Sequence, residues 1–279
     1  MERPVPTARC KHLLGLQRVY ELACNSERKQ VATMLTRSEK LESSEGAESL
    51  YRLSMRLYNG DGVPKDYKKA FKAAVAAAER GHAKAEVMVG AAYDHGLGTR
   101  RNRKRAFQYY ERAALRGYGD AQYDVAACYA EGIGVKASSR AAVRWLTLAA
   151  RQRVPEALDQ LGHSYRYGFG VRRDLKRGFR LQMAAARRGL ARAQFSVGVC
   201  YSRGEGVKED PAKALRWFMS AARRGHPEAA YNVAYYYEKG RGVHQNLRRA
   251  LKWYNKAAQM GDNQARSALR RLAQTPLPK

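Results

Sequence analysis

The stretch AAYNVAYYYEKGRGVHQNLRRALKWYNKAAQMGD, residues 229–262, contains two segments of helical periodicity separated by the glycines Gly240 and Gly242. The same pair recurs along the chain at an unbroken interval of 36 residues. Its other members are Gly60 and Gly62, Gly96 and Gly98, Gly132 and Gly134, Gly168 and Gly170, and Gly204 and Gly206. A chain that repeats one loop so regularly is built from a single supersecondary unit stacked on copies of itself.

The segment before each glycine pair has the spacing of an α-helix with one apolar side. In the quoted stretch this side holds Ala229, Val233, Ala234 and Tyr237. Small and aliphatic residues recur at the same positions of the other repeats, with a tyrosine or leucine last. Because such side chains fall on one stripe and let a neighbouring helix come close, we predict a helix A in every repeat.

The segment after each glycine pair has a second helical pattern, which ends on two consecutive alanines in all six repeats. A glycine follows in five of them and is expected to end this helix B with a positive φ angle, whereas Arg153 takes its place in the third repeat. His82 and His226 come directly after two of these glycines and are expected to cap helix B. Each repeat is therefore predicted to be a helical hairpin.

The period divides the chain into three parts. The six repeats are predicted at 47–82, 83–118, 119–154, 155–190, 191–226 and 227–262. Residues 263–279 imitate a further helix A followed by a tail, and we interpret them as a C-terminal capping helix. Residues 1–46 do not follow the period, and we expect an N-terminal cap or a partly disordered arm there.

The quoted stretch resembles the Sel1-like repeat, a relative of the tetratricopeptide repeat. The hallmark of that family is a helix A of the form A-x-x-x-L-G-x-x-Y, a G-x-G-V loop and a lysine-rich helix B containing W-Y and A-A. Repeats five and six match it best, and the resemblance covers about five-sixths of the chain. It implies an all-α fold, a right-handed α-solenoid of stacked helical hairpins, which serves as an adaptor for other proteins and has no catalytic residues.

Helix A lines the concave side in the tetratricopeptide relative, and this analogy implies a groove along the A helices here. The aromatic and histidine residues chosen as the partner-binding groove are Tyr51, Tyr58, Tyr123, His163, Tyr167, Phe195, Tyr231 and Tyr235. Tyrosine offers rigid contact area with a hydrogen-bonding tip. Since acids outnumber bases at the groove positions, we expect a protein or peptide segment with some positive charge to bind. Packing between repeats is the other interpretation of these tyrosines.

The formal net charge of +28 falls almost wholly within residues 47–279. Many of the basic residues recur at matching positions of helix B, where they predict a basic ridge. Its members are Lys68, Lys72, Lys104, Arg116, Arg144, Lys176, Arg180, Arg188, Arg216, Arg224, Arg248 and Lys252. The ridge is either a solvated outer face or a surface for polyanions, which include nucleic acid bound without sequence preference.

The sequence contains none of the usual motifs of a catalytic or cofactor site. No His-Glu-x-x-His, Gly-x-Ser-x-Gly or phosphate-binding loop occurs, so we expect no enzyme, no cofactor and no metal site. Cys128 and Cys200 stand two repeats apart, too far to form a disulfide. The cysteine spacing favours a reducing compartment. Because the sequence has no apolar signal core and no membrane span, we expect a cytoplasmic location. We also expect a monomer. The favoured function is a non-catalytic protein–protein interaction scaffold, and binding of polyanions by the ridge is the alternative.

Overall fold

The structure is a computed structural model that describes residues 46–274, and all of its regular elements over that range are helices. A first helix covers residues 46–59. The helices that follow are α3 (Tyr67–Glu79), α4 (Ala83–His95), α5 (Arg103–Leu115), α6 (Gly119–Glu131), α7 (Ser139–Arg151), α8 (Pro155–Tyr167), α9 (Leu175–Arg187), α10 (Ala191–Arg203), α11 (Pro211–Arg223), α12 (Pro227–Lys239), α13 (Leu247–Gln259) and α14 (Asn263–Ala273). The predicted all-α repeat fold is confirmed. The proposed N-terminal cap or arm (1–46) and the tail after residue 274 lie almost entirely outside the described residues.

The chain falls into two compact units, residues 1–86 and 87–279. In the first unit the hydroxyl of Ser54 donates to the carbonyl oxygen of Ala70 at 2.8 Å and joins helix 46–59 to α3. Leu53 occupies the position at which Val89 and Val125 are fully buried, yet its side chain is 42% exposed. Among the described residues, the stripe predicted to be buried is therefore partly exposed at this position.

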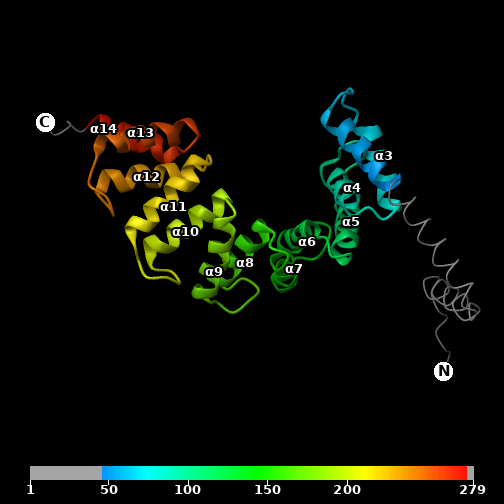
Figure 1. The fold of residues 1–279 in the computed structure, drawn as a ribbon, viewed down its shortest axis with the longest axis horizontal. Coiled ribbons are helices and arrows are strands. Elements are labelled where there is room, and N and C mark those ends of the chain that lie inside the picture. The colour runs from blue at the N-terminus through cyan, green and yellow to red at the C-terminus, as the bar shows by residue number, and fades with distance from the viewer. Residues whose placement is uncertain (1–45, 275–279) are drawn as a thin grey trace, which may run out of the picture. The chain divides into compact units, whose positions relative to one another are not determined.

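From α5 onward each helix packs on the next one along the chain, so that hairpins such as α6–α7 and α8–α9 follow one another (Figure 1). Helix α14 packs on α13 in the way that a further helix A would. Within the described residues no helix is long and apolar enough to cross a membrane.

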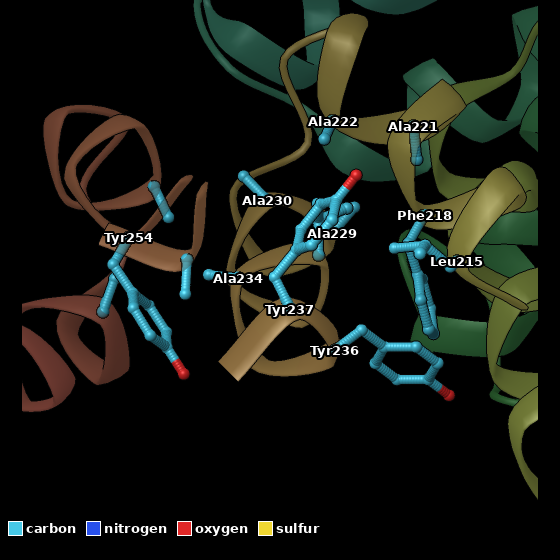
Figure 2. Close-up of a cluster of buried hydrophobic side chains, with 14 of the residues drawn as sticks. Leu215, Phe218, Ala221, Ala222, Ala229, Ala230, Ala234, Tyr236, Tyr237 and Tyr254 are labelled. Atoms are coloured by element: carbon cyan, nitrogen blue, oxygen red, sulfur yellow. The ribbon is translucent and has the colours of Figure 1, made fainter. Parts of the chain in front are cut away.

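Small side chains form most of the contact between hairpins. In the cluster of Figure 2, alanines of α11 and α12 are fully buried together, and the rings of Phe218 and Tyr236 meet edge to face with centroids 5.5 Å apart. Tyr254 of α13 completes the cluster and is also fully buried. The small and aliphatic stripe predicted for helix A therefore lies in the core, as expected.

In four of the pairs the two glycines have different tasks. The first, represented by Gly204 with φ +68°, ends helix A in the left-handed region. The second, Gly206, also has positive φ, and a Cβ there would overlap the backbone carbonyl of Leu175, the first residue of α9. Gly134, Gly170 and Gly242 meet the start of the preceding helix B in the same way. Glycine is therefore required both by the turn and by the close approach of consecutive repeats.

The ends of the helices agree with the sequence, and the histidines have a second role that was not predicted. The five closing glycines have positive φ, and Arg153 adopts φ +63° as the non-glycine exception within the described residues. His82 and His226 cap helix B as predicted, because their backbone N–H groups donate to the carbonyl oxygens of Ala77 and Ala221 at 3.1 Å. Each ring Nδ1 also accepts from the backbone three residues later, at Ala85 and Ala229, so the same histidines cap the start of the following helix A as well.

Candidate functional site: the face of the A helices

The first unit contains two of the predicted groove residues. Tyr51 stacks on His82 with ring centroids 4.5 Å apart, and the His82 ring is also held by the carboxylate of Glu48 at 2.9 Å. Tyr58 is 37% exposed and meets Tyr67 edge on. Tyr51 is thus partly occupied by packing, whereas Tyr58 presents more of its ring to solvent.

Three predicted groove residues near the C-terminal end are half-buried by packing. Phe195 stacks on His226 with centroids 4.6 Å apart, in the same arrangement as Tyr51 on His82. Tyr231 lies 5.5 Å from the buried ring of Tyr254, and Tyr235 is packed against the same cluster. Packing between repeats, the alternative interpretation, therefore largely explains why these three positions are aromatic.

The remaining three groove residues meet at one place in the second unit. Tyr123 of α6 and His163 of α8 line a hollow of about 360 Å³, and Tyr167 stacks on His163 with centroids 5.6 Å apart. We call this space the repeat 3–4 hollow. It is lined by Tyr123, Ala126, Ala127, Ala130, Glu131, Ser139, Ala142, Leu146, Gln160, His163, Ser164 and Phe169.

Phe169 forms one wall of the hollow and was missed by the sequence analysis. It stands between the two glycines of the repeat-four loop, and its side chain is 62% exposed. Its ring centroid lies 5.9 Å from that of Tyr167, which is itself 50% exposed. Two large aromatic side chains are therefore half-open to solvent beside a cavity. The residue between the two glycines varies from repeat to repeat, and this variation in the sequence could have pointed to Phe169.

The hollow exists because repeat three has small side chains where other repeats have large ones. Ala130 corresponds to Tyr58, Arg166 and Glu238 elsewhere, and Ala127 corresponds to Tyr235. One repeat further on, the places of Ala130 and Phe169 are taken by Arg166 and Glu205, which form an ion pair across the repeats. The contact that closes the groove between repeats four and five is therefore absent between repeats three and four.

Two acids that were expected to face the groove are buried instead. Asp159 is fully buried and accepts from Nε of Arg192 at 2.7 Å. Burial opposes the charge of Glu238, but hydrogen bonds from Arg271, Tyr254 and Lys239 outweigh it and lower the pKa of this carboxyl to about 2. Both acids thus hold repeats together and contribute little charge to the groove.

One concentration of acidic side chains lies on α6. Glu131 lines the hollow and is exposed, and Asp120 is exposed at the other end of the helix. Burial, and after it the charge of Asp120, raise the pKa of the Asp124 carboxyl to about 6. Among residues 46–274 none of these three acids has an ion pair with a lysine or arginine. In so basic a chain this is a local excess of negative charge.

His163 contributes a neutral ring to the hollow. Burial lowers its pKa, and the charges of Arg166 and Arg192 act in the same direction against that of Asp159. Its Nε2 lies 3.4 Å from the hydroxyl of Ser196. The lining of the hollow is therefore largely aromatic and aliphatic, with Ser139, Gln160 and Ser164 as neutral polar side chains and Glu131 as the charged one.

All twelve residues of the predicted basic ridge are exposed. Lys68 and Lys72 belong to the first unit and the others to the second. Helices α7, α9, α11 and α13 contain no aspartate or glutamate, so the ridge has no acidic neighbours on its own helices there. A separate column of basic residues packs on the tyrosines of helix A, as Arg177 does on Tyr165 at 4.3 Å. These packing cations are exposed as well, so they add to the basic surface of the B helices.

Stacked helical hairpins with a Gly-x-Gly loop define a class of α-helical repeat proteins, and the comparisons with known proteins give the family. The Sel1 repeat model matches residues 47–82, 83–118, 119–154, 155–189, 191–226 and 227–262. The chain therefore belongs to the Sel1 repeat family. Five of the six matched stretches have the boundaries predicted from the sequence, and the fourth ends one residue earlier. This family generally provides non-catalytic scaffolds that mediate protein–protein interactions.

Two solved structures are similar over most of this chain. One is c5321, a protective antigen of uropathogenic Escherichia coli strains with an SLR fold, at 30% identity and a TM-score of 0.74. The match covers 81% of this chain and 49% of c5321, so this chain spans about half the length of that protein. A Sel1 repeat protein from Oxalobacter formigenes matches at 32% identity and a TM-score of 0.73, over 76% of this chain and 87% of its own. No match was found among curated proteins.

Proposed function

We propose that this protein is a non-catalytic scaffold that binds a segment of another protein along the face of its A helices. The observation that carries the proposal is the repeat 3–4 hollow, a cavity bordered by half-exposed Tyr167 and Phe169 and lined by the predicted groove residues Tyr123 and His163. Aromatic side chains beside a pocket are the usual anchors of protein interfaces. The protein would act as a monomer.

A reducing, cytoplasmic location is part of this proposal. The free thiols of Cys128 and Cys200 are both buried, and burial is the main cause that raises their pKa values, to about 12 and about 11. Such thiols are protonated at neutral pH and are poor nucleophiles. They support a role in packing without disulfide formation.

The groove is tested by a pull-down from nuclease-treated extract with the double variant Tyr123→Ala, Tyr167→Ala as bait. We expect recovery of the partner to fall at least about tenfold, because truncating interface aromatics costs about 2 kcal/mol or more. The control removes exposed apolar side chains on B helices, Leu115→Ala with Leu148→Ala, and should bind as the wild type does. Equal recovery by both double variants would place the partner elsewhere.

Polyanion binding by the basic ridge is a second candidate, which the absence of acids from α7, α9, α11 and α13 favours. Such a surface attracts phosphates by releasing their counterions. We expect a single-stranded oligonucleotide to bind with little sequence preference and with strong salt dependence. The triple variant Arg144→Glu, Arg180→Glu, Arg216→Glu should lower the slope of log K against log salt by about 2, at about 0.7 per lost phosphate contact. Anisotropy titrations at several salt concentrations measure this, and an unchanged slope would exclude the ridge.

A further inference from the structure

The repeat 3–4 hollow is the size of an amino-acid side chain or two rather than of an extended peptide. Its volume of about 360 Å³ is near the lower end of the range for ligand pockets. Ala126, Ala127 and Ala142 form part of its floor, and the rings of Tyr123 and Phe169 belong to its walls. A cavity of this shape favours one apolar group inserted from the open side, because that group removes both its own surface and the exposed rings from water.

The opening of the hollow is a consequence of the sequence of repeat three. At the next interface along the chain, the guanidinium of Arg166 reaches the carboxylate of Glu205 and fills the equivalent place. Ala130 and Phe169, at the corresponding positions, leave it open. A partner side chain entering here would thus take the place that a side chain of the protein itself occupies one repeat later.

The negative charge next to the hollow determines which residues are favoured beside the inserted side chain. Glu131 lies on the lining, and Asp120 and Asp124 stand on the same helix, none of them paired with a lysine or arginine of the described chain. At physiological salt the screening length is about 8 Å, so a charge in direct contact with the ligand counts for more than charges farther away. A cation placed against Glu131 would gain a charge-assisted hydrogen bond.

We infer that the repeat 3–4 hollow binds the aromatic or leucine-sized side chain of a peptide segment that has a lysine or arginine beside this anchor. The inference rests on the proposed function and deepens it, since it names the chemistry of the segment and the place where it is read. The anchor supplies most of the affinity, and the Glu131 carboxylate distinguishes basic from acidic neighbours.

The test is a selection of random peptides displayed on phage against the full chain, followed by affinity measurements on the selected peptides. Enriched sequences should share an aromatic residue or leucine with an adjacent lysine or arginine. The variant Ala130→Tyr fills the hollow with the residue that repeat one has at this position, Tyr58, and should weaken their binding at least about tenfold. The matched control Ser202→Tyr introduces the same residue at the equivalent position of repeat five and should leave the affinity within about twofold.

Two further variants separate the parts of the inference. Phe169→Ala removes a wall without filling the cavity and should weaken binding about as much as Ala130→Tyr does, while Glu131→Gln should reduce the preference for basic neighbours. The selected peptides could bind Ala130→Tyr as tightly as the wild type but lose affinity for the double variant Tyr123→Ala, Tyr167→Ala. That result would overturn the inference about the hollow and leave the groove proposal standing. Enrichment of acidic peptides alone, or of none that respond to any groove variant, would overturn both.

Discussion

Replacing Gly206 by alanine is expected to lower the free energy of unfolding by about 3 kcal/mol or more. A Cβ at this position would overlap the carbonyl of Leu175, a backbone group that cannot rotate away as a flexible side chain can. The φ angle of +75° adds a further penalty for any residue with a side chain. The shift of the urea midpoint, followed by circular dichroism, measures the loss.

Gly225→Ala is the matched control for this prediction. Gly225 also has positive φ, +87°, but nothing lies within 4 Å of the place where its Cβ would be. Only the conformational penalty applies, and we expect a loss of about 1 kcal/mol. Equal losses in the two variants would show that the close approach of consecutive repeats contributes nothing to the need for glycine.

Glu238→Gln is expected to lower the free energy of unfolding at neutral pH by about 2–3 kcal/mol. The carboxylate lies at 3% exposure and accepts from the hydroxyl of Tyr254 at 2.7 Å and from the guanidinium of Arg271 at 2.8 and 3.0 Å. A neutral amide loses the charge of this network and turns a donor toward groups that are donors themselves. Glu209→Gln, at an exposed acid that pairs with Arg241 at 3.5 Å, should cost less than about 1 kcal/mol.

The pH dependence of this effect has a definite sign. Because folding lowers the pKa of Glu238 from 4.5 to about 2, the folded state binds fewer protons between these values than the unfolded state does. The stabilisation is fully present above about pH 4.5 and is lost as the pH falls toward 2. The difference in stability between the wild type and Glu238→Gln should therefore shrink over this window. A constant difference from pH 7 to pH 2 would contradict the ion-pair account.

The repeat architecture could be predicted from the sequence because its determinants are local and recur. The glycine pairs, the paired alanines and the exception at Arg153 each gave a feature that the structure contains. One further recurring feature of the sequence was missed. An aspartate, asparagine or serine precedes every helix B, and its side chain accepts a hydrogen bond from the first turn of that helix. These residues are Asp66, Asn102, Ser138, Asp174, Asp210 and Asn246.

The candidate site was harder to predict because it depends on contacts between repeats. Asp159 and Glu238 occupy groove positions by register, but Arg192 and Arg271, each 33 residues later, reach back and bury them. Phe169 reaches the hollow from the loop of repeat four, whereas most of the floor belongs to repeat three. A comparison of equivalent positions across the repeats treats each repeat alone. It cannot show whether a side chain of the next repeat fills the space beside a given position or leaves it empty.

The most direct test of the scaffold account is photo-crosslinking from both faces of the molecule in nuclease-treated extract. A photoreactive phenylalanine analogue replaces Tyr167 on the A-helix face or, in a second variant, Arg180 on the basic ridge. The account predicts a crosslinked protein partner from position 167 that is absent from position 180 and is reduced by Ala130→Tyr. Crosslinks to protein from position 180 alone, or adducts that disappear with nuclease, would contradict it and make the ridge the functional surface.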